Sequence, residues 1–208
     1  MHDHTAEAPP TRSYVIHWAR WYDVLGKIPF LRATRDTLLE VAAPSPGEHV
    51  LDVGCGTGTL AIAMKSRVGS GEVRGIDASS EMIEVAREKA TKAGAQVDFQ
   101  VVPMEGLPFA DASFDLVTSS LMLHHLPDDV KRQGLAQARR VLKPGGRFLA
   151  LDLLTQSHSP LHHILGLLGH ARAAGTVDTL RPMLKEAGFA EVEVVPTRHK
   201  HFVFIRAR

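Results

Sequence analysis

Three glycines at alternate positions, Gly54, Gly56 and Gly58, follow an apolar run that contains Asp52. Glycine-rich turns after a strand hold phosphates, dinucleotides or adenosyl cofactors, and each ligand implies a different chemistry. A dinucleotide fingerprint requires a glycine where this chain has Thr59, and a phosphate-binding P-loop requires a lysine that does not follow here. The spacing of the glycines therefore favours the third kind of ligand.

Two carboxylates accompany the turn and narrow the choice of ligand. Asp52 comes directly before the turn, where it would repel a pyrophosphate but can hold a cation. Asp77 ends the next apolar run, where a carboxylate can accept hydrogen bonds from both ribose hydroxyls. Asp77 can instead cap the helix that starts at "SSEM", although the nearby turn favours the ribose. Together these residues indicate an adenosine that carries positive charge and no phosphates.

The elements that must position these residues alternate along the chain. Periodicity predicts helices in two pieces over 13–43, broken near Gly26 and Pro29, and a last helix that begins near Asp178 with Pro182 in its first turn. The segment "SSEMIEVAREKATKAG" is a helix capped by serine and by Gly94. The other predicted helices are 57–68 and 128–142, and the predicted strands are 49–54, 72–77, 96–102, 114–120, 147–154, 191–195 and 201–206, the last two forming a hairpin.

This alternation predicts an α/β fold with a mainly parallel sheet, helices on both faces and an antiparallel hairpin at one end. Ligands of such sheets lie beyond the carboxyl ends of the strands. We expect one compact domain over 44–208, preceded by a helical extension over 1–43 that acts as a lid, with a further lid segment at about 157–174.

Composition excludes several functional classes. The chain has 208 residues, 23% of them charged, and a formal net charge of +1, so its overall charge does not favour binding to nucleic acid or to an anionic membrane. No apolar run approaches the ~18 residues of a membrane helix, and the polar start does not resemble a signal peptide. The single cysteine, Cys55, favours a reducing, cytoplasmic location. Composition gives no oligomeric state.

Four motifs in order carry a family resemblance. They are "VLDVGCGTGTLAIAM", "GIDASSEMIEVAREKA", "MEGLPFADASFDLVTSSLMLHHLPD" and "ARRVLKPGGRFLALDLL", which cover roughly residues 47 to 155. The chain resembles class I S-adenosylmethionine-dependent methyltransferases, and among them the ubiquinone/menaquinone-biosynthesis C-methyltransferase-like branch. The resemblance implies a Rossmann-like, seven-stranded, mainly parallel sheet whose last strand is antiparallel.

The resemblance also implies a cofactor, S-adenosyl-L-methionine, with S-adenosyl-L-homocysteine as product. The three glycines would let the backbone approach its methionine part, Asp52 would contact its amino group and Asp77 its ribose. Relatives commonly carry an acid where this chain has Pro103, which removes an acceptor for the adenine amino group. The residues implied to surround the cofactor are Asp52, Gly54, Cys55, Gly56, Gly58, Asp77, Ala78, Met82, Met104, Glu105, Ser119 and Tyr22.

Methyl transfer from a sulfonium needs alignment above all, since the methyl group is already activated; alignment can contribute ~7–11 kcal/mol. A general base is needed only if the acceptor must lose a proton. The candidate bases are His124, His125 and His17, while the adjacent pair can instead shape the turn before Pro127.

The segments outside the motifs should select the methyl acceptor. "SYVIHWARWYDVLG" concentrates aromatic residues, including Tyr22, on a short helix, and "SPLHHILGLLGHARAAG" is apolar along one side. The second segment can be a lid, a surface helix or a membrane-contacting helix. His158 and His162 have a spacing that zinc sites use, but no cysteine or H-E-x-x-H accompanies them, so polar lid residues are favoured and we expect no metal.

We therefore predict a cytoplasmic methyltransferase that acts on a small, partly apolar molecule, with neither nucleic acid nor stable membrane insertion. One alternative is a cofactor-binding regulatory module without turnover, which Pro103 and the undefined base leave open. Another is a nicotinamide-dependent oxidoreductase, which Thr59 disfavours. The single cysteine argues against a thiol-based arsenite methyltransferase, and no Asn/Asp-Pro-Pro-aromatic motif follows the fourth predicted strand.

Overall fold

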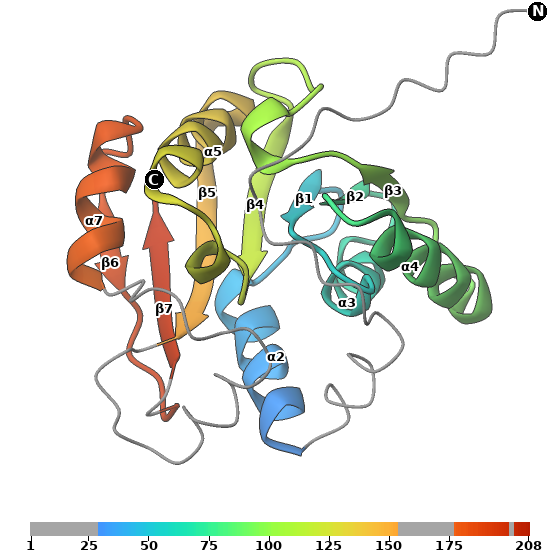
Figure 1. The fold of residues 1–208 in the computed structure, drawn as a ribbon. Helices are drawn as coiled ribbons and strands as arrows, with labels where there is room; N and C mark the ends of the chain where they lie inside the picture. The colour runs from blue at the N-terminus through green and yellow to red at the C-terminus, as the bar shows by residue number, and fades with distance from the viewer. Residues whose placement is uncertain (1–28, 154–176, 200–201) are drawn as a thin grey trace, which may run out of the picture.

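The structure is a computed structural model that describes residues 29–153, 177–199 and 202–208 (Figure 1). Its sheet has seven strands in the order β3-β2-β1-β4-β5-β7-β6. The strands are β1 (Val50–Val53), β2 (Val73–Asp77), β3 (Asp98–Val101), β4 (Phe114–Ser120), β5 (Leu142–Leu153), β6 (Val192–Val194) and β7 (Phe202–Ala207). The helices are α2 (Pro29–Ala42), α3 (Thr59–Val68), α4 (Ser80–Ala93), α5 (Asp128–Val141) and α7 (Val177–Glu186), with short 3₁₀ turns η1 (Met104–Gly106) and η2 (Leu123–His125).

The sheet is parallel except at one end. Strand β1 lies between β2 and β4 and is parallel to both, while β4 continues the parallel pairing to β5. Strand β7 is antiparallel to β5 and to β6. The predicted seven-stranded, mainly parallel sheet with an antiparallel last strand is therefore confirmed, as is the predicted hairpin.

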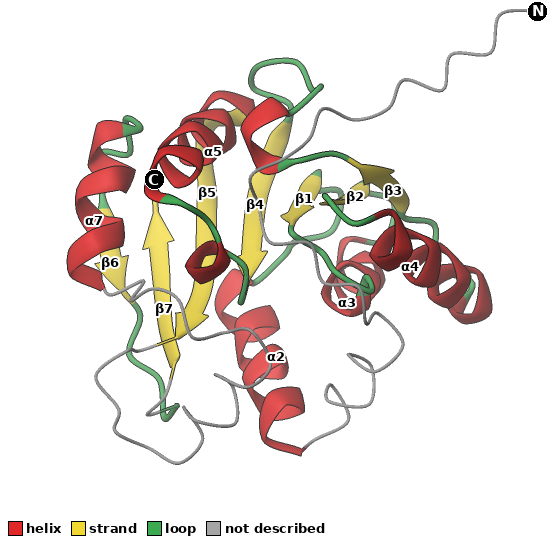
Figure 2. Ribbon diagram, in the orientation of Figure 1, coloured by secondary structure: helices red, strands yellow, loops and turns green. Residues whose placement is uncertain are grey.

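Helices cover both faces of the sheet (Figure 2). Apolar side chains of α2, α3 and α4 join one buried cluster, in which Leu38, Met64 and Ile83 are fully buried. Apolar side chains of α5 and α7 join a second cluster on the other face, together with Met104 and Leu123 of the two 3₁₀ turns. Alternate residues of the strands enter the two clusters, which is why the central strands are apolar on both sides.

Two predicted boundaries differ from the structure. Strand β5 begins at Leu142 rather than Arg147, because Leu142 pairs with Phe114 ahead of a register shift and Gly145 takes a left-handed φ of 78°. Helix α7 begins next to Asp178 as expected, but the expectation that Pro182 lies in its first turn is wrong, since that residue is the sixth of the helix. The helix tolerates the missing N–H because its apolar face is buried against the core.

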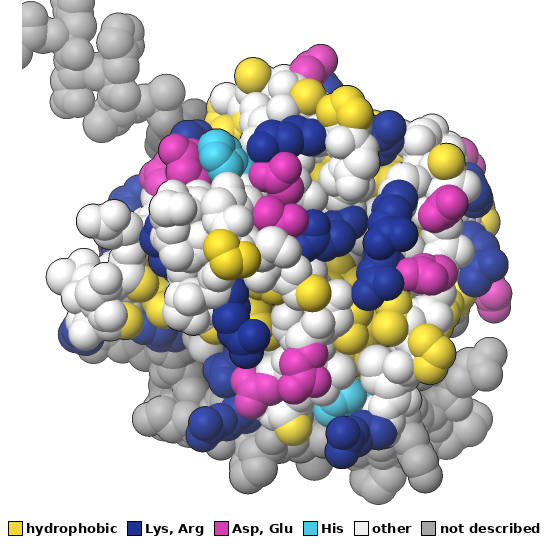
Figure 3. Space-filling model, turned by 180° about the vertical axis from the view of Figure 1, so that it is seen from behind, with side chains coloured by type: hydrophobic (Ala, Val, Ile, Leu, Met, Phe, Trp, Pro, Cys, Tyr) yellow, Lys and Arg dark blue, Asp and Glu magenta, His cyan; other side chains and the backbone are white. Residues whose placement is uncertain are grey.

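The caps of α4 are confirmed. The Met82 N–H donates to the Ser79 side chain at 3.3 Å, and Gly94 closes the helix in the left-handed conformation. Figure 3 shows the molecule from behind, where Lys and Arg side chains lie next to Asp and Glu side chains at several places. None of the helices in the described parts of the chain is long and apolar enough to cross a bilayer.

Several expectations fall outside the described residues. These are the first helical piece before Pro29, with His17 and Tyr22, and the segment 157–174, with its four histidines. Within the ranges that are described, no group of three metal-ligating side chains is found.

Candidate functional site

The three glycines of the turn after β1 have left-handed φ angles of 69°, 53° and 74°, which favour glycine. A side chain at Gly54 would meet the Cγ of Met122 at 2.4 Å, and one at Gly58 would meet the ring of Phe99 at 2.6 Å. A side chain at Gly56 would meet nothing within 4 Å among the described residues. Sequence reasoning gave all three glycines one role, whereas the structure gives the outer two a packing role and leaves open space only beside Gly56.

Asp77 at the end of β2 connects this turn to α4. Its carboxylate accepts the Gly56 N–H at 2.9 Å and the Ser79 N–H at 2.9 Å. Burial raises the pKa of Asp77, against the lowering effect of backbone N–H donors. The carboxylate thus has a local structural role, and it stays beside the open space at Gly56.

Asp52 in β1 is 1% exposed and accepts a hydrogen bond of 2.8 Å from the Thr118 hydroxyl of β4. Burial raises the pKa of Asp52 from 3.8 to about 7; the Thr118 hydrogen bond opposes this shift and the charge of Asp77 adds to it. Two neighbouring carboxyl groups therefore resist ionisation together. A cationic ligand beside them would favour their ionised forms.

The Cys55 thiol lies inside the same turn. Burial raises its pKa well above the usual value, and the charges of Asp52 and Asp77 raise it further. A thiol held in its protonated form is a poor nucleophile. This environment therefore favours a packing role for Cys55 over a nucleophilic one.

Lys89 of α4 reaches the turn, a contact that sequence reasoning missed. Its ammonium donates to the hydroxyls of Thr57 and Thr59, both at 2.9 Å. Thr59 stands where a dinucleotide fingerprint has glycine, and here its hydroxyl is an acceptor for this lysine. The turn is therefore held at two places, by Asp77 of β2 at Gly56 and by Lys89 of α4 at Thr57 and Thr59.

The side chains expected around adenine are largely buried. Met82 is 3% exposed and Met104 is 5% exposed. The Met104 side chain lies against Gly134 of α5, and a Cβ added at Gly134 would lie 2.1 Å from the Cγ of Met104. The structure thus places this side chain in the core between η1 and α5. Ala78 and Glu105 are half-buried.

The chain turns sharply where β4 ends. Leu121 has a φ of 54°, a strained value for leucine, and its N–H donates to the Leu151 carbonyl of β5 at 2.8 Å. The next residue, Met122, lies over Gly54. The Ser119 hydroxyl at this end of β4 is buried without a hydrogen-bond partner among the described residues.

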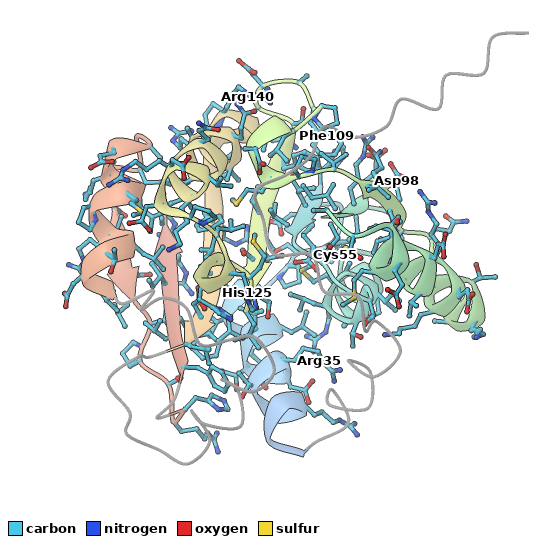
Figure 4. All side chains as sticks on the ribbon, viewed as in Figure 1. Arg35, Cys55, Asp98, Phe109, His125 and Arg140 are labelled. Carbon is cyan, nitrogen blue, oxygen red and sulfur yellow. The ribbon has the colours of Figure 1, made fainter. Side chains whose placement is uncertain are left out.

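Turn η2 then brings a histidine to β5. The Nδ1 atom of His124 lies 2.5 Å from Oδ1 of Asp152, and the two residues are 2% and 0% exposed. The ring of His125 lies 4.0 Å from that of His124, and Figure 4 shows labelled His125 and Cys55 near the middle of the view, below Phe109 and above Arg35. Sequence reasoning missed Asp152, whose only signal was a carboxylate near the end of an apolar strand.

The comparisons with known proteins agree with this geometry. A family model described as "Methyltransferase domain" matches residues 50–146. The "O-methyltransferase cnsE" of Penicillium expansum is 36% identical over 80% of this chain, and the chain spans only 60% of that protein. The "Ubiquinone/menaquinone biosynthesis C-methyltransferase UbiE" of Laribacter hongkongensis is 34% identical over 84% of this chain and 82% of its own length.

Among solved structures, a SAM-dependent methyltransferase from Aquifex aeolicus aligns with a TM-score of 0.74, covering 91% of this chain and 97% of its own. Its 23% identity shows a shared fold. The family model and the long match to UbiE confirm the resemblance inferred from the four motifs. The chain belongs to the class I S-adenosylmethionine-dependent methyltransferases, and it is similar to their ubiquinone/menaquinone-biosynthesis C-methyltransferase branch.

Proposed function

We propose that the chain binds S-adenosyl-L-methionine at the glycine turn and transfers its methyl group to a small, partly apolar molecule. The observation that carries this proposal is the open space beside Gly56, with the carboxyl groups of Asp52 and Asp77 next to the turn. A sulfonium and an ammonium suit these carboxyl groups, and a pyrophosphate does not. Lys89, the lysine that the described residues bring to the turn, donates to two threonine hydroxyls.

Each proposed contact follows from this placement. The backbone at Gly56 lies against the methionine part of the cofactor, Asp52 favours its ammonium group, and Asp77 accepts the ribose hydroxyls with its remaining lone pairs. We also assign a lining or supporting role to the other residues expected from the motifs, which are Gly54, Cys55, Gly58, Ala78, Met82, Met104, Glu105, Ser119 and Tyr22.

The bound cofactor supplies an activated methyl group. The chain's own contribution is to align the acceptor with that group and to exclude water, and alignment contributes on the order of 7–11 kcal/mol. We propose that residues 1–43 and 157–174 supply the acceptor pocket on the domain formed by 44–208. The relatives' names, an O-methyltransferase and a quinone-biosynthesis C-methyltransferase, support a small-molecule acceptor. A cytoplasmic location, expected from the single cysteine, is part of the same proposal.

A cofactor-binding module without turnover is the second candidate. Pro103 favours it, because a proline at the start of η1 offers no side-chain acceptor to the adenine amino group. The two candidates differ in one measurable product, S-adenosyl-L-homocysteine.

Calorimetry with S-adenosyl-L-methionine, S-adenosyl-L-homocysteine and NADH tests the ligand. We expect binding of both adenosyl compounds and none of NADH. Gly56→Val should abolish that binding, whereas Gly47→Val should retain it. Gly47 is a matched control because it also has a left-handed φ, 84°, and open space around it, but it precedes β1 at the opposite end of the strand. Loss of binding in both variants, or in neither, would contradict the proposed site.

Transfer is tested separately. Labelled methyl groups from S-adenosyl-L-methionine should appear on small molecules of a metabolite extract, with release of S-adenosyl-L-homocysteine. Tight cofactor binding without any release would instead identify the non-catalytic module.

A further inference from the structure

We propose that a hollow at the amino ends of the parallel strands binds a small aromatic anion, either an aryl carboxylate or an aryl phosphate. The hollow has a volume of about 500 Å³, which is within the usual range for small-molecule sites. The residues that carry the argument are Arg74, Lys143, His49 and Phe109, all of which line the hollow. This site is separate from the glycine turn, so the inference goes beyond the proposed methyl transfer.

The hollow lies where the parallel strands begin. His49 directly precedes β1, Arg74 is the second residue of β2, and Lys143 is the second residue of β5. The glycine turn follows β1 at its other end. Figure 4 accordingly shows Phe109, which lines the hollow, above Cys55 of the glycine turn. Ligands of parallel sheets usually bind beyond the carboxyl ends of the strands, so the hollow is not part of the proposed cofactor site.

Three side chains of this hollow can donate hydrogen bonds to an anion. The Arg74 guanidinium lies 3.4 Å from the Glu72 carboxylate, and the two side chains are 36% and 57% exposed. Exposed ion pairs of this kind are weak, so Arg74 can exchange Glu72 for the anionic group of a ligand. The Lys143 ammonium donates to Asp115 at 2.8 Å and retains two further N–H donors. His49 donates its backbone N–H to Asp115, and no hydrogen bond engages its imidazole in the described parts of the chain.

An apolar wall stands next to these donors. The Phe109 ring packs edge-on against the Phe114 ring, with 5.2 Å between the centroids, and the Arg74 guanidinium lies 5.4 Å from the centroid of Phe109. This cation–π contact keeps the guanidinium beside the wall, to which Pro108 and Ala110 also contribute. An anionic group bound by Arg74 would therefore bring its attached apolar body against the wall. Neither an inorganic anion nor a neutral apolar compound would use both halves of the hollow.

The loop that forms the apolar wall is held in place by α5. The Arg140 guanidinium of this helix donates to the carbonyls of Leu107 and Phe109, at 2.9 and 2.7 Å, and to the Asp111 carboxylate at 2.7 Å. Ala112 of the same loop has a φ of 54°, which is strained for alanine, and its N–H donates to the Arg140 carbonyl at 3.1 Å. Strain of this kind clusters at ligand-binding sites. A hollow that is fixed before binding loses less conformational entropy when a ligand enters it.

The test uses benzoate and phenyl phosphate as the anionic probes and benzamide as their neutral counterpart. Calorimetry measures the affinities, and the backbone amide signals in nuclear magnetic resonance spectra locate the bound probe. We expect saturable binding of at least one anion, with shifted signals at residues 107–114 and at Lys143. Benzamide should bind about 10–100-fold more weakly than the preferred anion, because it lacks the charge that strengthens a hydrogen bond from Arg74. The tighter of the two anions identifies the ligand as a carboxylate or a phosphate.

Two arginine variants test the assignment of the anionic group. Arg74→Gln should weaken binding of the preferred anion about 10–100-fold. Arg132→Gln is the matched control, because Arg132 also forms an exposed ion pair, with Glu186, but does not line the hollow. It should leave anion binding unchanged, and both variants should bind S-adenosyl-L-homocysteine as the wild type does.

Other outcomes overturn the inference. These are no saturable binding of either anion at millimolar concentration, equal binding of benzamide, equal losses in the two arginine variants, and signal shifts at the glycine turn instead of the hollow. If Arg74→Gln does not fold, Lys143→Gln must show the same loss of anion binding, and retained binding would refute the site. Failure of the wild type to bind S-adenosyl-L-homocysteine would refute the proposed function and not this inference, since the two sites lie at opposite ends of β1.

Discussion

Replacing Asp52 by asparagine removes a carboxyl group whose ionisation the fold disfavours. Burial raises the pKa of Asp52 from 3.8 to about 7. Each pH unit of difference between the folded and unfolded states corresponds to about 1.4 kcal/mol, so the ionised carboxylate costs the folded state roughly 4 kcal/mol. Asparagine has nearly the same shape, keeps one oxygen that accepts from Thr118 and carries no charge, but it lacks the second oxygen, which accepts from the Ala61 N–H.

The pH dependence has a definite sign. Well below pH 4 the Asp52 carboxyl is protonated in both the folded and the unfolded state, and the variant and the wild type should be nearly equally stable. As the pH rises toward 7 the unfolded state releases its proton first, which lowers the stability of the wild type alone. At pH 8 we therefore expect Asp52→Asn to be more stable by up to roughly 4 kcal/mol.

Urea unfolding of both proteins without ligand, at several pH values between these limits, measures the difference. Asp98→Asn, at an exposed residue of the edge strand β3, is the control and should show no comparable gain. A variant that is no more stable than the wild type at pH 8 would refute the reasoning. Calorimetry completes the assay: the stabilised variant should bind S-adenosyl-L-homocysteine more weakly, since a ligand ammonium favours a carboxylate over an amide.

Three further changes test the glycine turn. Lys89→Met should weaken S-adenosyl-L-homocysteine binding about three- to tenfold in calorimetry, because the Lys89 ammonium fixes the part of the turn proposed to face the methionine part of the ligand. Binding of 5′-methylthioadenosine should stay unchanged. The control variant Lys92→Met should change the binding of neither ligand. Gly58→Ala should lower the free energy of unfolding in urea by about 2 kcal/mol more than Gly47→Ala. Both glycines have a left-handed φ, but of the two only Gly58 faces a side chain, so only there does an added methyl group also meet a neighbour. Equal losses of stability in the two variants would contradict this reasoning. Asp77→Ala should weaken S-adenosyl-L-homocysteine binding by about 1.5–3 kcal/mol, and unchanged affinity in a folded variant would exclude Asp77 from the site.

The sequence predicted those parts of the fold that depend on local pattern. Strand β4 matches its predicted bounds at both ends, because an apolar run stands between turn residues. The start of β5 did not follow from local pattern, since residues 143–146 resemble a turn and belong to the strand only because Leu142 and Arg147 on either side of them pair with β4. Pro182 was misplaced for a similar reason, because burial of the apolar face of α7 outweighs the local cost of a proline.

In the candidate site, too, local sequence pattern predicted some features, whereas others depend on contacts between distant residues. Spacing alone indicated the glycine turn and its two carboxylates, but it could not tell Gly56 from Gly58, because Phe99 fills the space at Gly58 from another strand. Asp152 lies 28 residues beyond His124 in the chain, and the apolar pattern of β5 does not indicate that one of its residues pairs with so distant a side chain. Contacts between distant residues depend on strand order and register, which composition and periodicity do not encode.

The position of β7 has a consequence for the order of folding. Residues 202–207 follow β6 in the chain but lie between β5 and β6, so β6 has no edge to join until β7 has paired with β5. The parallel strands that carry the glycine turn need neither of them as a neighbour. We therefore expect α7, β6 and β7 to form a late cooperative unit that opens before the rest of the sheet. In native-state hydrogen exchange their amides should exchange together, at a lower opening free energy than those of β1 and β4.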